Sequence, residues 1–320
     1  MLPNASLTRK ETEKAKEGLF SRFSKSESAA VTVIIAILLL GLIFAVISIV
    51  RLHYVPEWKS EAEQDHVYNV WDDMVGVKAE IDMLLILMNS GSYSPNNFSA
   101  TVPFSLGGGT VKVFEPTKSA GKLEVNGEKC TMTVTPCNAS QSVNYTFECG
   151  GISCYLENRE YPDQVFRYEN NALILADGRN SLMRQSPAFT INETSKDNYT
   201  FTIYSVNLSG KADSISSNTV TPLQLTGWGT TLIYNSSQDT LIKPNAFNLT
   251  IATKYPGAWS AYFNETAQDK GLKFGESYKV EMPDSGSVRF SFLPGSSKKL
   301  QQLYVSKAVV LTEIPDPYKW

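Results

Sequence analysis

The feature that most constrains this chain is an uncharged apolar run near the N-terminus of its 320 residues. The segment Ala29–Val50 contains no charged side chain, and only Thr32, Gly41 and Ser48 interrupt its apolar character. As a helix it rises about 33 Å, enough to cross a hydrocarbon core of about 30 Å. The run therefore predicts one membrane-spanning helix, with the folded part of the chain after it.

Basic residues flank this run unequally. Only Arg51 and Lys59 follow it closely, whereas six precede it: Arg9, Lys10, Lys14, Lys16, Arg22 and Lys25. Because positive charge is retained on the cytoplasmic side, we expect a cytoplasmic N-terminus and an extracellular C-terminal domain. The alternative is a cleaved secretory signal. Such a signal normally has only about 7–15 apolar residues, and no small-residue cleavage site follows Val50.

Four cysteines lie close together in the part that is expected to be extracellular: Cys130, Cys137, Cys149 and Cys154. An even, clustered set in such a compartment predicts two disulfides, with three ways of pairing. A zinc site is the alternative, but there is no C-x-x-C, and the two histidines, His53 and His66, are distant. We therefore expect no metal ligands and no cofactor.

Asn-x-Ser/Thr sequons also concentrate after the apolar run. Asn4 precedes the run, and nine follow it: Asn97, Asn138, Asn144, Asn192, Asn198, Asn207, Asn235, Asn248 and Asn264. If the topology is as predicted, these nine are candidate glycosylation sites and Asn4 is not.

The chain divides into four predicted parts. Residues 1–25 form a cytoplasmic leader, 26–52 the transmembrane helix and 53–90 an extracellular amphipathic helix. Residues 91–320 form a β-rich domain, and two subdomains within it would divide near residues 180–195.

A heptad pattern predicts the second helix. Pro56 suits its first turn and Asn89 its end. The apolar positions repeat at spacings of three and four: Val67, Val70, Met74, Val77, Ile81, Leu84 and Met88. This stripe fits either a coiled-coil stalk between chains or a helix covered by its own domain. We favour the second, because residues 81–88 are apolar almost all round. The residues that widen this end are Met83, Leu85, Ile86 and Leu87.

After residue 100 the pattern changes to alternating segments separated by turn residues, which is typical of strands. Hairpins are predicted at Asn126-Gly127, at Glu169-Asn170-Asn171 and at Pro283-Asp284-Ser285-Gly286. Residues 223–225 and 231–234 are expected to be two separate strands. A short amphipathic helix is predicted at residues 256–271.

The predicted fold class is therefore α+β. A long N-terminal transmembrane helix and an amphipathic helix precede a mainly antiparallel, sandwich-like β domain with a short helical insertion.

Motifs that carry catalysis are missing from the sequence, which has no G-x-S-x-G, H-E-x-x-H or G-x-x-x-x-G-K. Gly107-Gly108-Gly109 precedes a predicted strand, so we interpret it as a flexible turn. We expect no catalytic residue and no enzyme activity. A glycosidase whose two acids lie far apart in the chain is the alternative. The net charge of −3 gives no indication of nucleic-acid binding.

Four aromatic residues suggest either of two roles: Trp228, Tyr255, Trp259 and Tyr262. They fit a platform on which sugars stack, or the packing of the β core and the short helix. We favour packing.

The segment Lys25-Ser26-Glu27-Ser28-Ala29-Ala30-Val31-Thr32-Val33-Ile34-Ile35 resembles the N-terminus of archaeal type IV pilin-like and archaellin-like proteins. Two later stretches, 161–175 and 255–263, look like a large archaeal group with that type of N-terminus. The resemblance implies processing between Ser26 and Glu27. Thr32 and Ile35 stand where the family usually has Pro and Gly, and Glu27 would be the first residue of the processed chain rather than a few residues inside it.

The resemblance implies a non-catalytic structural protein of the archaeal cell envelope. Its partners would be the lipid bilayer and copies of itself or other pilin-like subunits. The alternative is an adhesin-like binding module displayed on a helical stalk, whose ligand the sequence does not identify; a surface glycan is one candidate.

Overall fold

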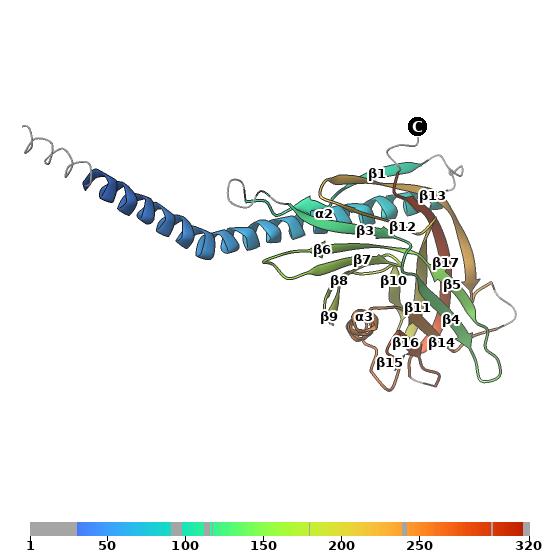
Figure 1. Cartoon of the computed structure of the whole chain (residues 1–320). Coiled ribbons are helices and arrows are strands. Elements are labelled where there is room, and N and C mark those ends of the chain that lie inside the picture. Colours follow the sequence, from blue (N-terminus) through green and yellow to red (C-terminus); the bar gives the residue numbers. More distant parts are fainter. Residues whose placement is uncertain are drawn as a thin grey trace, which may run out of the picture. The chain divides into compact units, whose positions relative to one another are not determined.

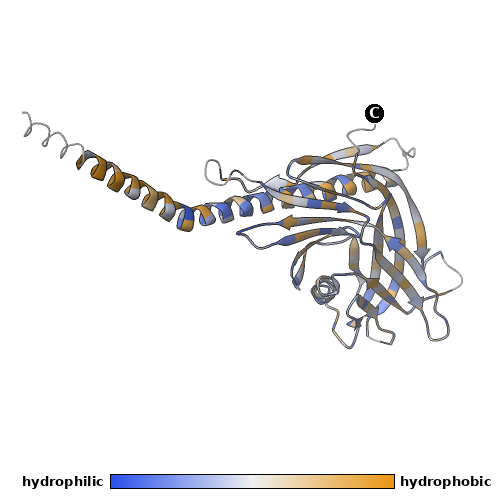
Figure 2. Ribbon diagram, in the orientation of Figure 1, coloured by the Kyte–Doolittle hydropathy of each residue, from blue (hydrophilic) through white to orange (hydrophobic). Residues whose placement is uncertain are grey.

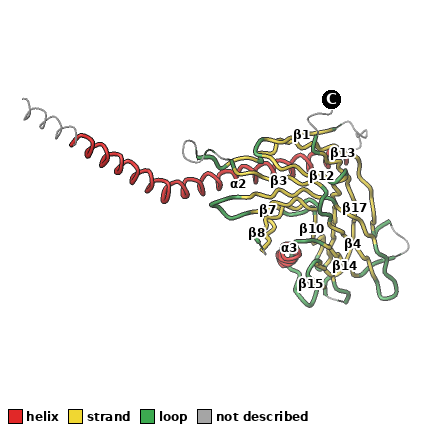
Figure 3. Tube along the Cα trace, in the orientation of Figure 1, coloured by secondary structure: helices red, strands yellow, loops and turns green. Residues whose placement is uncertain are grey.

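The computed structural model describes residues 31–90, 98–111, 116, 118–178, 180–238, 242–295 and 297–315. The helices and strands of these residues are drawn in Figures 1 and 3. The chain forms two compact units, Met1–Trp58 and Lys59–Trp320. Asn4, the processing candidates Ser26 and Glu27, and the sequon residue Asn97 lie outside the described residues.

One uninterrupted helix begins the described part of the chain. Residues 31–49 are α-helical, η1 (Val50–Tyr54) is a π-helical turn, and α2 (Val55–Asn89) continues it. We predicted that Pro56 begins a new helix, and this is wrong, because Pro56 lies inside the continuous one. A proline ring crowds the carbonyl four residues earlier, here that of Leu52, and the wider π turn provides room there.

The second unit is built mainly from strands, with one further helix, α3 (Pro256–Asp269). The described strands are β1 (Ser99–Ser105), β2 (Gly107–Gly108), β3 (Ser119–Val125), β4 (Cys130–Cys137), β5 (Tyr145–Cys149), β6 (Gly151–Glu157), β7 (Gln164–Glu169), β8 (Ala172–Asp177), β9 (Asn180–Gln185), β10 (Phe189–Ser195), β11 (Asn198–Ser209), β12 (Asp213–Ser217), β13 (Val220–Asn235), β14 (Ala246–Ala252), β15 (Tyr278–Asp284), β16 (Ser287–Phe292) and β17 (Lys299–Glu313).

The strands form three sheets. The first has the order β1-β13-β17-β11-β10, and the second has the order β12-β3-β6-β7-β8-β9 with β2 paired to β3. The third has the order β15-β16-β14-β4-β5. The paired strands are antiparallel except β11 and β17, which are parallel. The predicted α+β class with a mainly antiparallel β domain is confirmed.

The stripe of α2 packs inside its own domain. All seven heptad residues are buried, in one core with residues of the first and second sheets such as Phe104, Leu123 and Val310. The self-packed interpretation is therefore confirmed and the coiled-coil stalk is excluded. The far end of the helix is less enclosed than we predicted, because Met83 and Ile86 are 55% and 71% exposed.

A second core lies beneath α3. It contains a cluster of aromatic rings from the first and third sheets and from α3, among them Phe189, Phe201, Phe247, Phe263 and Phe290. The ring centroids of Phe201 and Phe247 are 4.8 Å apart. The two cores together give the domain its sandwich-like packing.

The first sheet contributes to both cores through opposite faces. In β11, Phe201 and Ile203 enter the aromatic core, whereas Val206 and Leu208 enter the core around α2. Neighbouring residues of a strand point to opposite faces, so the change from odd to even numbers means a change of face. Strand β17 changes face at the matching place, from Leu303 and Val305 to Ala308 and Val310.

Two of the three predicted hairpins are confirmed. Strands β7 and β8 pair across Asn170-Asn171, whose φ angles of 48° and 66° suit a two-residue hairpin turn. Strands β15 and β16 also pair.

The hairpin predicted at Asn126-Gly127 is wrong. Strand β3 pairs with β6 and β12 in the second sheet, whereas β4 pairs with β5 and β14 in the third. The N–H of Asn126 donates to the carbonyl of Gly151, 2.8 Å away, so the turn is bound to another strand and leads from one sheet to the other.

The two short strands predicted at residues 223–225 and 231–234 are one strand, β13. Its pairing with β17 is irregular at Gly227/Gly229 and at Leu232/Tyr234, so the strand continues through bulges rather than ending.

Candidate functional site

The first cluster of polar side chains joins α2 to the second sheet. Lys59, Glu63 and His66 lie within two turns of the helix, and all three are buried. Buried charge of this kind requires partners. Glu63 Oε2 accepts hydrogen bonds from three consecutive backbone N–H groups, those of residues 159–161, at 3.0, 2.9 and 3.0 Å. The Ser119 hydroxyl donates to Oε1 at 2.6 Å.

These contacts control the ionisation of Glu63. Burial raises the pKa of this carboxyl, but the hydrogen bonds from Ser119 and from the three backbone N–H groups outweigh burial and hold its pKa below the ordinary value. Lys59 Nζ lies 3.6 Å from Oε1 and donates to the carbonyl of Gly109. Since protein donors surround the carboxylate, its chemistry is that of a structural anchor rather than of a general acid or base.

The glycine triplet allows the helix to approach this closely. A Cβ atom on Gly108 would lie 2.3 Å from the imidazole of His66, and one on Gly109 would lie 2.7 Å from the Cγ of Glu63. Gly109 also has a φ of 67°. The interpretation of the triplet as a flexible turn is therefore wrong, because these glycines are packing contacts.

Further polar contacts hold the rest of α2. The carboxylate of Asp73 accepts from the N–H of Ser105 at 2.7 Å, and burial raises the pKa of this carboxyl. Two turns from the end of α2, Asp82 accepts from Lys78 Nζ and from Asn171 Nδ2, both at 2.9 Å. The helix is thus tied to the strands along its length.

A second cluster is the ion pair of Arg167 and Glu169 on β7, both almost fully buried. Arg167 Nε lies 3.5 Å from Glu169 Oε2. Glu169 Oε1 accepts from the Trp259 indole at 3.0 Å and from the Thr253 hydroxyl at 2.6 Å. The guanidinium also donates to Ser153 Oγ at 2.9 Å. Strand β7 and helix α3, which are far apart in the sequence, therefore meet at this ion pair.

The sugar-stacking platform is not assembled. Tyr255, Trp259 and Tyr262 are buried, and Trp259 is only 1% exposed, whereas Trp228 lies on β13 and is 54% exposed. Desolvation by burial raises the pKa of the Tyr262 hydroxyl, which donates to the carbonyl of Phe189 at 3.1 Å. The favoured packing role is confirmed for these three residues.

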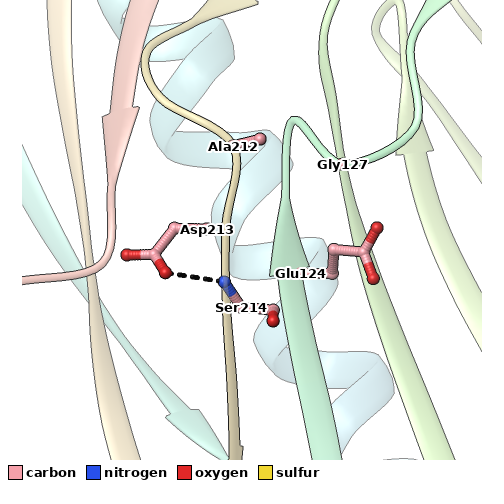
Figure 4. A pocket seen from close by; sticks show the side chains of 5 residues that line it. All are labelled: Glu124, Gly127, Ala212, Asp213 and Ser214. Atoms are coloured by element: carbon pink, nitrogen blue, oxygen red, sulfur yellow. Dashed lines mark hydrogen bonds between the residues drawn. The ribbon is translucent and has the colours of Figure 1, made fainter.

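A hollow of about 370 Å³ lies between β3 and β12. Figure 4 shows its two carboxylates, on Glu124 and Asp213, pointing in opposite directions. Asp213 accepts from the N–H of Ser214 at 2.8 Å, and Glu124 pairs with Lys122 at 2.7 Å. Because the two acids do not converge, this hollow has neither the acid pair of a glycosidase nor the ligands of a metal.

A smaller hollow of about 220 Å³ borders Asn126. Asn126 is 4% exposed, and neither of its amide atoms has a hydrogen-bond partner among the described protein atoms. The two charges at the rim, Lys129 and Glu148, lie 3.0 Å apart and pair with each other. A buried amide beside a small polar hollow is typical of a water site and indicates no particular substrate.

The four cysteines are thiols in the structure. Cys130 and Cys149 lie opposite each other on β4 and β5, but Cys137 lies at the far end of β4 and Cys154 lies on β6 in the second sheet. The two predicted disulfides are therefore not found, and the cysteines do not form two neighbouring pairs.

The described sequon residues differ in what their side chains do. Asn144 and Asn192 are exposed. Asn198 and Asn264 use Nδ2 as a donor within the protein, Asn264 to the carbonyl of Ser260 at 3.0 Å. The remaining described ones are half-buried: Asn138, Asn207, Asn235 and Asn248.

Within the described ranges, no group of three or more His, Cys, Asp or Glu side chains is arranged to hold a metal ion. When the chain is compared with protein-family models, with curated proteins and with solved structures, none matches.

The feature that remains is the apolar helix. Every residue from 31 to 49 is exposed, and the large apolar side chains among them are between 44% and 68% exposed. Figure 2 shows this segment as almost continuously hydrophobic. By length and composition it is one candidate membrane span.

Proposed function

We propose that this chain is a membrane-anchored extracellular structural protein of the archaeal cell envelope, pilin-like and without catalytic activity. The observation that carries the proposal is the contrast along one helix. Residues 31–49 are apolar and exposed all round, whereas the stripe from Val67 to Met88 is covered by strands of the same chain.

The exposed segment requires a cover. Burying a large apolar side chain is worth about 1.5–3 kcal/mol, and this segment carries more than a dozen of them. A bilayer supplies that cover over the whole length of the segment. Equivalent helices of other copies, packed in a filament, would also supply it.

The orientation in this proposal follows from the basic residues before residue 29, which favour a cytoplasmic N-terminus. The β domain would then be extracellular, and exposed sequon residues such as Asn144 and Asn192 would be open to glycosylation. A structural role is supported by the two buried clusters, whose charged groups bind protein donors and acceptors rather than facing a cavity.

The first experiment locates the chain and its N-terminus. Membrane fractionation of cells that make the full chain, with mass spectrometry of the mature N-terminus, should find a membrane protein that begins at Glu27. Protease added to whole cells should remove residues 100–320, and Asn4 should be unmodified in any material that retains it. Recovery in the soluble fraction without detergent, or protection of the β domain, would refute the proposal.

A matched pair of variants tests the anchor itself. Leu38→Arg with Leu42→Arg places two charges in the apolar segment, each costing about 2.5–3.5 kcal/mol at the membrane centre. The control, Met83→Arg with Ile86→Arg, places the same charges on exposed positions of α2. Only the first pair of substitutions should move the protein out of the membrane fraction.

The way in which the chain assembles distinguishes the pilin-like proposal from the adhesin-like alternative. Electron microscopy of surface material sheared from cells should show filaments that contain this chain if copies cover one another's helices. Detergent-extracted single chains that bind surface glycans would instead support the adhesin-like alternative.

A further inference from the structure

Two of the four cysteines face each other across neighbouring strands. Cys130 on β4 and Cys149 on β5 are direct partners in the antiparallel register. They are 1% and 0% exposed, and each thiol affects the pKa of the other. β5 is the edge strand of the third sheet, so this contact lies where the sheet ends.

The register brings these cysteines within bonding range. Residues opposite each other in an antiparallel pair have Cα atoms about 4.5–5.5 Å apart, inside the range of about 4.4–6.8 Å that disulfides need. Facing residues of an antiparallel pair typically have Cβ atoms about 4.5–5.5 Å apart, and disulfides need about 3.5–4.5 Å, so closing the bond requires a small approach of the two strands as well as rotation of the side chains.

The other two cysteines face different residues. Cys137 lies opposite Ala246 of β14. Cys154 lies opposite Leu123 on one side and Phe166 on the other, in the core around α2. Neither register places a second cysteine beside them.

The surroundings give the two facing thiols different reactivity. The hydrogen bond from Cys130 lowers the pKa of the Cys149 thiol, and the Ser205 hydroxyl, 3.2 Å from its sulfur, acts in the same direction. The same contact raises the pKa of Cys130. In the folded domain Cys149 is therefore the more acidic thiol of the pair.

We propose that Cys130 and Cys149 become a disulfide while the domain folds, by exchange with a small-molecule or protein disulfide, and that Cys137 and Cys154 remain thiols. The bond would fasten the edge strand β5 to β4. It would also close a loop of 18 residues between the two cysteines.

The exchange has two steps. One of the two cysteine thiolates attacks one sulfur of the oxidant's disulfide, forms a mixed disulfide and releases the other sulfur as a thiolate. The thiolate of the second cysteine then attacks the cysteine sulfur of this mixed disulfide and releases the second thiolate of the oxidant. Two electrons pass from the cysteines to the oxidant, and the two protons that the cysteines lose are taken up by the released thiolates.

Burial determines when the exchange takes place. An oxidant cannot reach side chains that are 1% exposed or less, so the bond forms before the core closes. Once formed, it is shielded from external reductants by the same packing.

Refolding tests this directly and does not depend on where the protein resides. The full chain is reduced, unfolded, and refolded in detergent with a mixture of reduced and oxidised glutathione. It is then quenched in acid, alkylated under denaturing conditions and mapped without reduction. A linked Cys130–Cys149 peptide with alkylated Cys137 and Cys154 is expected. Four alkylated cysteines, or a link through Cys137 or Cys154, would overturn the proposal.

Thermal unfolding gives a second readout. A chain refolded in the presence of reductant should have a Tm about 6–12 °C below that of the chain refolded with oxidant, the shift expected when a loop of this length is left open. Cys137→Ser should keep this dependence on reductant, and Cys130→Ser with Cys149→Ser should lose it. If the double variant does not fold, the peptide map of the unchanged chain still decides. A Tm that is the same with and without reductant would count against the bond.

Discussion

Leu84 provides the sharpest test of how α2 is used. It is 3% exposed and belongs to the core shared by the helix and two sheets. Two residues further along the same helix, Ile86 is 71% exposed. An aliphatic side chain can therefore be replaced by the same residue at a buried site and at an exposed site of one helix.

The magnitude follows from that difference. Leu84→Ala removes buried methyl groups and leaves a cavity, which typically costs about 2–5 kcal/mol. At about 2–4 °C per kcal/mol for a domain of this size, the Tm should fall by roughly 4–20 °C. Ile86→Ala removes side-chain atoms that already face outward and improves helix propensity, so the free energy of unfolding should stay within about 0.5 kcal/mol.

The assay is thermal unfolding of the full chain in detergent, followed by circular dichroism at a wavelength that reports strands, with the molecular mass measured in parallel. A second pair, Leu84→Asp and Ile86→Asp, repeats the comparison with a charge. Only Leu84→Asp should unfold the domain, because only that substitution places a carboxylate in the core.

Two results would refute this reasoning. Equal destabilisation by Leu84→Ala and Ile86→Ala would mean that the two faces of the helix are not distinguished by the domain. A fall in molecular mass at an unchanged Tm would mean that Leu84 packs between chains, as in a coiled-coil stalk.

Three further outcomes are expected from the buried charges and the sequons. Glu63→Gln should lower the free energy of unfolding by about 1–3 kcal/mol at pH 7, because an amide cannot accept hydrogen bonds from all the donors around it. Since the folded-state pKa of Glu63 is lowered, its stabilisation is present above the ordinary glutamate pKa and is lost as pH falls through the lowered value. Urea titrations should therefore show an acid decline below about pH 4 that is smaller in the variant. Glu169→Gln should lose about 3–5 kcal/mol in urea unfolding by leaving the buried guanidinium unpaired, whereas Glu276→Gln, in an exposed pair, should change nothing measurable. In intact glycopeptides from native material, exposed Asn144 should be occupied more often than Asn264, whose Nδ2 is engaged inside α3.

The helix was predictable because its signal is local and repeated. Seven apolar positions in one register indicate a buried face, whatever covers it. The same register, continued one step back from Val67, falls on Glu63, so the sequence also contained a sign of the anchor that we did not use. A carboxylate at a core position of a heptad requires partners. The partners of Glu63, at residues 159–161, are nearly a hundred residues away, and no sequence pattern predicts them.

Strand pairing was predictable only where the turn alone determines it. Asn170-Asn171 and Asn126-Gly127 are similar turn signals, yet only the first closes a hairpin. At Asn126 the backbone bonds to Gly151, and β3 takes its partners from two distant segments. A local turn preference worth a fraction of a kcal/mol cannot outweigh a full ladder of sheet hydrogen bonds formed elsewhere.

The packing of α2 inside the domain affects how the chain responds to mechanical force. The helix of residues 31–49 continues into α2, so in the proposed function a force on the membrane segment would reach Lys59 through the backbone. Between residues 59 and 89 that force meets the bonds of Glu63, Asp73 and Asp82, and a stripe of seven buried apolar side chains. These contacts belong to the same core as strands of the first and second sheets, so the helix cannot slide out while the domain stays folded.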